Sequence, residues 1–323
     1  MKRHRLGTSG LQVSEICIGC MTFGEPLRGG HPWTLPEDQS KPLILKAVEA
    51  GVTFFDTANV YSDGSSEEIL GRVLWQAVPR DEIVLATKVH GDDDPNWRGL
   101  SRRAIMRQVD LSLKRLQTDW IDLYQIHRFD PDTPVEETMQ ALNDLIRMGK
   151  VRYIGASTMA AWQFAKLQEA ARANGWTPFI SMQNQLSLLY REEEREMLPL
   201  CADQGVGIIP WSPIARGRLA RPAGAETERT RSDQYGKMLF DQTADADRAV
   251  IDAVQAVAAE TGRTMAQVAL AWVRQKPGVA APIVGYSRPD QFDDILAGLS
   301  LVLTPDQIAR LEAPYVPHAP RDH

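Results

Sequence analysis

The chain has 323 residues, a length that fits one α/β barrel as readily as two or three smaller domains, and we expect a single domain over residues 1–323. Its composition, with 43% hydrophobic and 24% charged residues, is ordinary for a globular protein. A formal net charge of −6 argues against a nucleic-acid partner, although a local basic pocket for a phosphate-bearing cofactor is still allowed.

Cysteines and apolar runs narrow the class further. Cys17 and Cys20 form a C-x-x-C pair, but no second Cys or His pair lies nearby to complete a zinc site, so we expect no metal. No apolar run approaches the roughly 20 residues that span a bilayer, which predicts no membrane partner. The basic first residues are not followed by a hydrophobic stretch, so we expect no signal peptide and a cytoplasmic protein.

In chain order, the first predicted element is a small hairpin at residues 2–14, turning at residues 7–10, which should cap the bottom of the fold. Short, continuously apolar runs then recur, as strands buried on both faces of a parallel sheet require. There are eight of them, at residues 16–19, 53–56, 83–88, 121–127, 152–156, 179–183, 207–211 and 282–285.

Segments with helical period separate these strands. They cover residues 41–50, 65–76, 102–116, 135–148, 160–173, 192–203, 265–275 and 289–297. The eightfold alternation predicts a closed (β/α)8 TIM barrel, with an open doubly wound sheet as the alternative. The absence of G-x-G-x-x-G after the first strand counts against that open sheet. Residues 215–247 are expected to form a long irregular loop after strand 7, at a barrel mouth where function is expected.

Four polar residues stand at or just beyond the ends of three successive strands. Asp56 ends the second strand, Tyr61 follows it, Lys88 ends the third and His127 ends the fourth. In a barrel these ends converge on one face, where active sites are built. A buried Lys88 needs a partner, and Asp56 is the natural one. A tyrosine held against that lysine and a histidine should become a stronger acid, suited to protonating a developing alkoxide.

Each of these residues also has a structural explanation when taken alone. An aspartate at a strand end often caps a helix, a lysine or histidine can be a satisfied structural residue, and a tyrosine can be a packing aromatic. Their joint occurrence in this order favours the catalytic interpretation.

Three stretches of the sequence resemble the aldo-keto reductases. The first comprises Phe54-Phe55-Asp56-Thr57-Ala58 and Tyr61, followed by Gly64, Glu67, Leu70 and Gly71; the second runs from Arg115-Leu116 to His127; the third is Pro282-Ile283-Val284-Gly285-Tyr286-Ser287-Arg288-Pro289. The resemblance extends from Leu11 to about Leu311. The segment His127-Arg128-Phe129-Asp130-Pro131 suggests a bacterial branch of the family similar to potassium-channel β-subunits.

The resemblance implies a role for each member of the tetrad. Tyr61 would donate a proton to the substrate carbonyl oxygen, and Lys88 with Asp56 would form the ion pair that tunes it. His127 would orient that oxygen, as either a neutral or a cationic ring. Hydride would come from the nicotinamide of NADPH. The implied function is therefore reduction of an aldehyde or ketone to an alcohol, and the alternative is an NADPH-binding redox-sensing regulatory subunit with little turnover.

The resemblance also implies a set of cofactor contacts. An aromatic ring at Trp211 would stack on the nicotinamide, and Thr158 departs from the family's commoner Asn. Besides Asp56, the expected contacts are Gly19, Cys20, Met21, Ser157, Thr158, Gln183, Trp211, Ser212, Pro213, Ile214, Ala215, Arg216, Gly217, Arg231, Gly285, Ser287, Arg288, Gln291 and Asp294. Arg288, Arg231 and Arg229 favour NADP over NAD because a guanidinium binds a 2′-phosphate bidentately, although each also fits a solvated loop.

Aromatic residues on the mouth loops suggest a pocket for an apolar or flat carbonyl compound. Trp33 and Trp97 are the candidate substrate contacts beside Tyr61 and His127. A rival enzyme class is a phosphate-binding barrel isomerase or aldolase in which Lys88 forms a Schiff base. The expected partner is a small-molecule carbonyl substrate, with a homo-oligomer possible.

Overall fold

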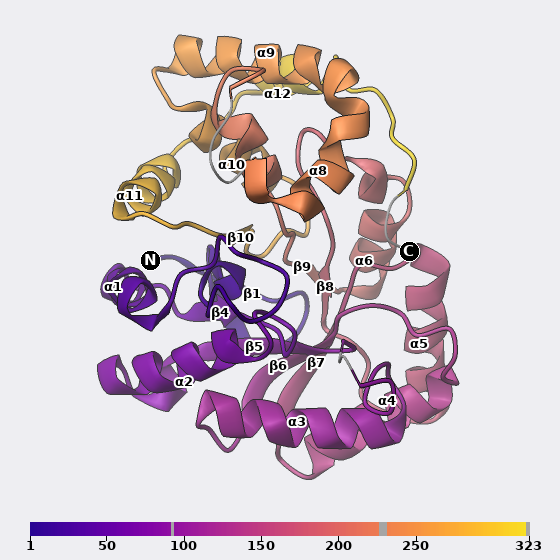
Figure 1. Cartoon of the computed structure of the whole chain (residues 1–323). Helices are drawn as coiled ribbons and strands as arrows, with labels where there is room; N and C mark the ends of the chain where they lie inside the picture. The colour runs from indigo at the N-terminus through magenta and orange to yellow at the C-terminus, as the bar shows by residue number, and fades with distance from the viewer. Residues whose placement is uncertain (92–93, 226–230, 321–323) are drawn as a thin grey trace.

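An eight-stranded parallel sheet forms the centre of the computed structural model, which describes residues 1–91, 94–225 and 231–320. Figure 1 shows the strands in the middle and helices α1 to α6 around their outside. The strands lie in the order β10-β3-β4-β5-β6-β7-β8-β9. Their bounds are Cys17–Gly19 (β3), Phe54–Asp56 (β4), Val84–Val89 (β5), Ile121–Ile126 (β6), Val151–Ser157 (β7), Ser181–Gln183 (β8), Gly207–Ile208 (β9) and Ile283–Val284 (β10).

Backbone hydrogen bonds close this sheet on itself. The Ile208 N–H donates to the Gly278 carbonyl at 2.9 Å, and the Ala280 N–H donates to the Ile208 carbonyl at 2.8 Å. The Ile283 N–H donates to the Pro210 carbonyl at 2.9 Å. The last strand segment therefore joins β9 as well as β3, which confirms the predicted (β/α)8 barrel and excludes the open doubly wound sheet.

The eight predicted helical segments are helical in the structure, with two shifted starts, one of them α1, which begins at Glu37, four residues before the predicted start. They are α1 (Glu37–Glu49), α2 (Ser65–Ala77), α3 (Arg102–Leu116), α4 (Val135–Arg147), α5 (Ala161–Ala173), α6 (Met197–Gln204), α10 (Met265–Arg274) and α11 (Pro289–Gly298). The segment predicted at residues 192–203 begins as a 3-10 turn over Glu192–Glu194, and the α-helix starts only at Met197. Three consecutive glutamates lack the apolar positions that anchor a helix on the sheet.

The segment after β9 is more regular than predicted. Residues 215–247 were expected to be irregular, yet they include helix α8 (Gln234–Phe240) and the start of α9 (Ala244–Thr261), whereas Ala215–Ala220 forms 3-10 turns broken by a kink at Arg216 and Gly217. Apolar side chains of α9, among them Val250 and Val254, are buried in a second core. That core also holds Trp272 of α10 and Leu311 of α12 (Pro305–Glu312). The α9 sequence is rich in alanine and has buried apolar residues at helical spacing, which favours a helix. This helix was not predicted because the segment before it was interpreted as a loop.

The predicted hairpin caps the amino-terminal end of the barrel. Strands β1 (Arg3–Arg5) and β2 (Gln12–Ser14) pair antiparallel, and the Thr8 N–H donates to the Gly205 carbonyl at 2.8 Å. Gly7 lies so close to the start of β9 that a Cβ there would be 2.4 Å from the Gly205 oxygen and 2.5 Å from the Gly207 nitrogen. Among the described residues, no helix has the length and apolarity that crossing a membrane would require.

Gly7→Ala should lower the free energy of unfolding by about 2–4 kcal/mol, because the methyl group meets backbone atoms and Gly7 has a φ of +60°. Gly175→Ala is the matched control, since Gly175 has a φ of +66° but no atom within 4 Å of its would-be Cβ. The control should lose only about 1 kcal/mol through backbone strain. Urea unfolding of both variants measures this, and equal losses would show that the hairpin contact contributes nothing.

Candidate active site

The four polar residues predicted to act together do converge at the carboxyl ends of the barrel strands. Asp56 is the last residue of β4, Lys88 lies in β5, and His127 directly follows β6. Tyr61 comes from the loop that leads out of β4. Because parallel strands end at one rim, residues far apart in sequence meet there.

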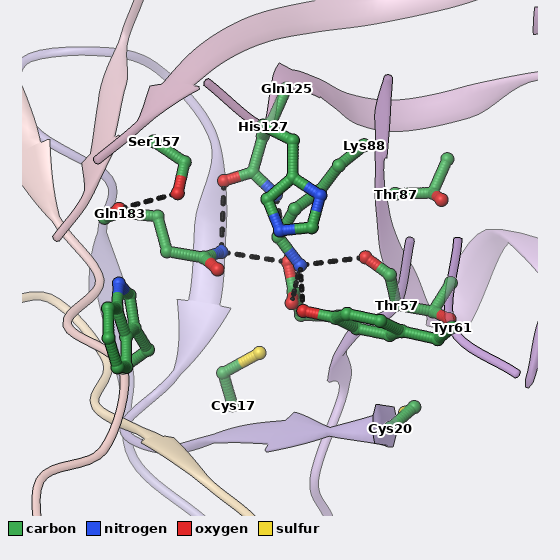
Figure 2. Close-up of polar contacts among 12 residues, drawn as sticks. Cys17, Cys20, Thr57, Tyr61, Thr87, Lys88, Gln125, His127, Ser157 and Gln183 are labelled. Atoms are coloured by element: carbon green, nitrogen blue, oxygen red, sulfur yellow. Dashed lines mark hydrogen bonds and ion pairs between the residues drawn. The ribbon is translucent and has the colours of Figure 1, made fainter. Parts of the chain in front are cut away.

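Lys88 is the centre of the cluster and is fully buried. Its ammonium forms an ion pair with Asp56 Oδ1 and donates to the Thr57 carbonyl at 2.8 Å and to Tyr61 Oη at 3.2 Å (Figure 2). The three N–H groups of the ammonium therefore have three acceptors. The phenol oxygen of Tyr61 accepts from Lys88, which leaves the phenol proton available for another acceptor.

The charge on Lys88 is favoured by its neighbours. Burial by itself lowers the pKa of the Lys88 ammonium, but the carboxylate of Asp56 and the phenol of Tyr61 act in the opposite direction, and the pKa ends above its ordinary value. The site therefore holds a permanent positive charge beside the tyrosine hydroxyl.

The imidazole ring of His127 lies against the phenol ring of Tyr61. The rings of Tyr61 and His127 meet edge to face, with centroids 5.8 Å apart and planes at 81°. Enclosure in the protein holds the pKa of His127 well below its usual value, and the positive charges of Lys88 and Arg128 lower it further. The sequence left a neutral and a cationic ring equally open; the structure favours the neutral imidazole.

Two amides complete the surroundings of Asp56. Gln125 Nε2 donates to Asp56 Oδ2 at 2.8 Å, and Gln183 Nε2 donates to the same oxygen at 2.9 Å. Gln183 was predicted as a cofactor contact, whereas Gln125 was not predicted at all. Its signal was present in the sequence as a polar residue inside the apolar fourth strand, but its register opposite Lys88 is known only from the sheet pairing.

A cleft of about 1360 Å³ opens above these residues. It exceeds the roughly 300–1,000 Å³ of sites for drug-sized ligands, so it has room for an extended cofactor and a small substrate together. Its lining contains most of the predicted contacts: Gly19, Met21, Trp33, Asp56, Tyr61, His127, Ser157, Gln183, Trp211, Ser212, Pro213, Ile214, Arg216, Gly217, Gly285, Ser287, Arg288, Gln291 and Asp294.

Several predicted contacts do not line the cleft. Cys20 and Ala215 are fully buried beneath its wall. The Thr158 hydroxyl accepts from Trp211 Nε1 at 3.0 Å, so it supports the tryptophan. Arg231 lies outside the lining, and Arg229 falls outside the described residues.

Trp97 is not placed at the predicted substrate site. It is absent from the cleft lining, and its ring packs under the guanidinium groups of Arg103 and Arg107, whose central carbons lie 4.4 and 4.0 Å from the ring centre. Both arginines belong to the helix α3, so the tryptophan folds back onto that helix and away from the cleft.

Other lining residues were not predicted as contacts. They are mostly on the loops after β3 and β9 and include His31, Thr34, Leu35, Val60, Arg128, Tyr235, Thr264 and Ile295. The Arg216 guanidinium lies 5.7 Å from the ring centre of Trp33 and 5.5 Å from that of Tyr235, and its Nε donates to Asp233 at 2.6 Å. Tyr235 was missed because its segment was expected to be irregular.

Comparison with known proteins agrees with this geometry. The family model described as "Aldo/keto reductase family" matches residues 15–315. The chain belongs to the aldo/keto reductase family. That membership, the closed barrel and the cluster at its carboxyl rim make the chain an oxidoreductase of the carbonyl-reducing type.

Relatives in the family are similar over nearly their whole length. A versiconal hemiacetal acetate reductase of Aspergillus parasiticus is 47% identical, with 99% of this chain and 98% of the relative covered. A putative aryl-alcohol dehydrogenase of Schizosaccharomyces pombe is 43% identical, with 97% of this chain and 95% of the relative covered. The aldo-keto reductase AMT2 of Alternaria alternata is 42% identical, with 99% of this chain and 93% of the relative covered. These relatives are fungal, so they do not support the expected placement in a bacterial branch like the potassium-channel β-subunits.

The ring of His127 should stay neutral throughout the near-neutral range, because enclosure and adjacent cations oppose its protonation. Histidine NMR spectra recorded between about pH 5.5 and 8 would test this, since an unperturbed imidazole titrates near 6.5. The His127 signals would be assigned by their loss in His127→Asn. Signals that shift with a midpoint near 6.5 would contradict the neutral assignment.

Proposed function

We propose that the protein reduces an aldehyde or ketone to an alcohol with NADPH as hydride donor and Tyr61 as proton donor. The observation that carries this proposal is the contact of one buried ammonium, Lys88, with both the Asp56 carboxylate and the Tyr61 hydroxyl at the floor of the cleft. A phenol held against a fixed positive charge is suited to giving its proton to an oxygen that is becoming an alkoxide.

The chain's own residues account for the proton half of the reaction. A carbonyl oxygen in the cleft would accept hydrogen bonds from Tyr61 and from the neutral His127, which fix its position. As negative charge develops on that oxygen, Tyr61 gives up its proton, and the adjacent ammonium of Lys88 stabilises the phenolate that remains. Asp56 keeps the ammonium in place. The nicotinamide supplies the hydride when bound.

The cleft residues fit a nicotinamide dinucleotide. Gln183 presents an amide and Trp211 an indole ring to the cleft near the tetrad. Ser212, Ala215, Arg216 and Gly217 all have positive φ, which curls the backbone of this turn. Turns of this kind form concave anion sites, so we assign the pyrophosphate to this segment. The adenosine end would lie at Gly285, Ser287, Arg288, Gln291 and Asp294.

The Schiff-base alternative is disfavoured by the contacts of Lys88. A lysine that attacks a carbonyl must be neutral and accessible. This one is fully buried, has three acceptors for its three N–H groups, and has a raised pKa.

An aromatic carbonyl compound is the substrate class that we favour. Trp33, Tyr235, Val60 and Leu35 all line the cleft, so it offers apolar and aromatic surface to a flat ring. Relatives named aryl-alcohol dehydrogenases are in line with this choice.

Tyr61→Phe should reduce turnover by about 100-fold or more, because general-acid catalysis typically contributes 10²–10⁴. NADPH consumption with 4-nitrobenzaldehyde or 9,10-phenanthrenequinone would be followed by absorbance, and NADPH affinity by fluorescence. Affinity should change little. Tyr153→Phe, which removes a hydroxyl from β7 near the hairpin, is the matched control and should keep full turnover. Full activity in Tyr61→Phe would rule out the proton-donor role, and tight NADPH binding without wild-type turnover would favour the redox-sensing alternative.

NADPH should bind about tenfold or more tightly than NADH, because the cleft offers Arg288 for a 2′-phosphate. In the structure Arg288 pairs with the exposed Asp290 at 2.9 Å, a weak surface contact that a phosphate can replace. Arg288→Leu should reduce the preference for NADPH over NADH by weakening NADPH binding, without affecting NADH affinity. Equal binding of the two cofactors by the wild-type protein in fluorescence titrations would contradict the assignment.

A further inference from the structure

Gln125 is a buried amide at the centre of the barrel that the mechanism above does not use. It lies in β6, two residues before His127 and in register with Lys88 of β5. Its side chain is fully buried. The neighbouring strand makes room for it, because a Cβ on Gly155 of β7 would lie 3.2 Å from Gln125 Cγ.

The hydrogen bonds of Gln125 join two parts of the site. Its Nε2 donates to Asp56 Oδ2 at 2.8 Å, and its Oε1 accepts from Gln183 Nε2 at 3.1 Å. Gln183 Nε2 donates to Asp56 as well, at 2.9 Å (Figure 2). Asp56, Gln125 and Gln183 thus form a closed triangle with Lys88 bound at its Asp56 corner.

The carboxylate determines which way both amides face. An ionised carboxylate only accepts hydrogen bonds, so each glutamine must turn its NH2 group toward Asp56. Gln125 Oε1 then faces the NH2 group of Gln183 and accepts a second hydrogen bond from it, in addition to the one that Asp56 accepts. Gln183 Oε1 is consequently turned away from the triangle, where both hydrogen bonds of this side chain are made by its Nε2.

We propose that Gln125 is a positioning residue that fixes the Gln183 amide with its oxygen toward the cleft. An oxygen there matches a ligand that presents an N–H donor, as the carboxamide of a nicotinamide does. Through Asp56 the same residue ties the cofactor-holding amide to the ammonium that supports Tyr61. This inference rests on the proposed NADPH-dependent function, and it concerns a residue that does not itself contact the cofactor.

A double-mutant cycle on NADP⁺ affinity tests whether Gln125 acts through Gln183. Gln125→Leu should weaken NADP⁺ binding about fivefold, the value of one hydrogen bond, as measured by protein fluorescence. In a Gln183→Leu background the same substitution should have no further effect. A fivefold loss in both backgrounds, or none in either, would overturn the inference.

Gln168→Leu is the matched control. Gln168 is a buried glutamine of α5 that bonds the backbone of Phe179 at 3.1 and 2.8 Å. It should lower stability without changing NADP⁺ affinity, and a fivefold weakening there would mean that loss of any buried amide suffices. A wild-type protein that binds no NADPH would overturn the proposed function together with this inference, whereas an additive cycle overturns the inference alone.

Gln125→Glu provides a second variant if the leucine variant does not fold. A protonated glutamic acid reproduces both bonds of the glutamine, since its O–H donates to Asp56 and its carbonyl accepts from Gln183. A glutamate repels Asp56. NADP⁺ affinity of this variant should therefore be close to that of the wild type in mild acid and fall about fivefold relative to it toward alkaline pH. The same pH dependence in variant and wild type would contradict the proposal.

Discussion

The ion pair between Lys88 and Asp56 is the interaction on which the site depends. Both charges lie in the barrel interior, where an unpaired charge costs several kcal/mol. Their cost is offset because every N–H of the ammonium and both oxygens of the carboxylate have partners. Satisfying them draws in Tyr61 and the amides Gln125 and Gln183. One buried pair thus organises residues from β4, β5, β6 and β8, and the phenol belongs to the set because it completes the shell of the ammonium.

The two halves of the site are built differently. The proposed proton-handling half is built on the strand residues Asp56, Lys88 and Gln125, which buried hydrogen bonds fix in place, with Tyr61 and His127 just beyond the strand ends. The half that we propose to hold the cofactor is formed largely by the loops and helix ends that follow β9 and β10. It includes the Arg216–Asp233 ion pair, which ties the turn after β9 to the start of α8. Precise placement is therefore concentrated where the proposed mechanism transfers a proton, and adaptability where the proposed cofactor would enter and leave.

The sequence was sufficient to predict the parts of this arrangement that follow from local rules. Continuous apolar runs and helical periods located the strands and eight helices, and polar residues at strand ends located the tetrad. Gln125 was not predicted as a site residue because its role depends on lying opposite Lys88. That position follows from the register of the sheet and cannot be read from the local sequence. Trp97 was predicted as a substrate contact, but its ring packs against arginines of α3. The local sequence does not show this tertiary contact either. The helix α9 was not predicted because it lies next to a segment interpreted as loop.

Closure of the barrel has a consequence for how the molecule reaches its native state. The hydrogen bonds that complete the sheet join β3, near the amino terminus, and β9 to residues 278–284 near the other end. Until those residues arrive, β3 and β9 are edge strands with unpaired backbone groups, which invite association with other chains. Such long-range pairing gives a high contact order and slow folding. A nascent or truncated chain that ends before residue 278 would thus expose two unpaired strand edges, at β3 and at β9.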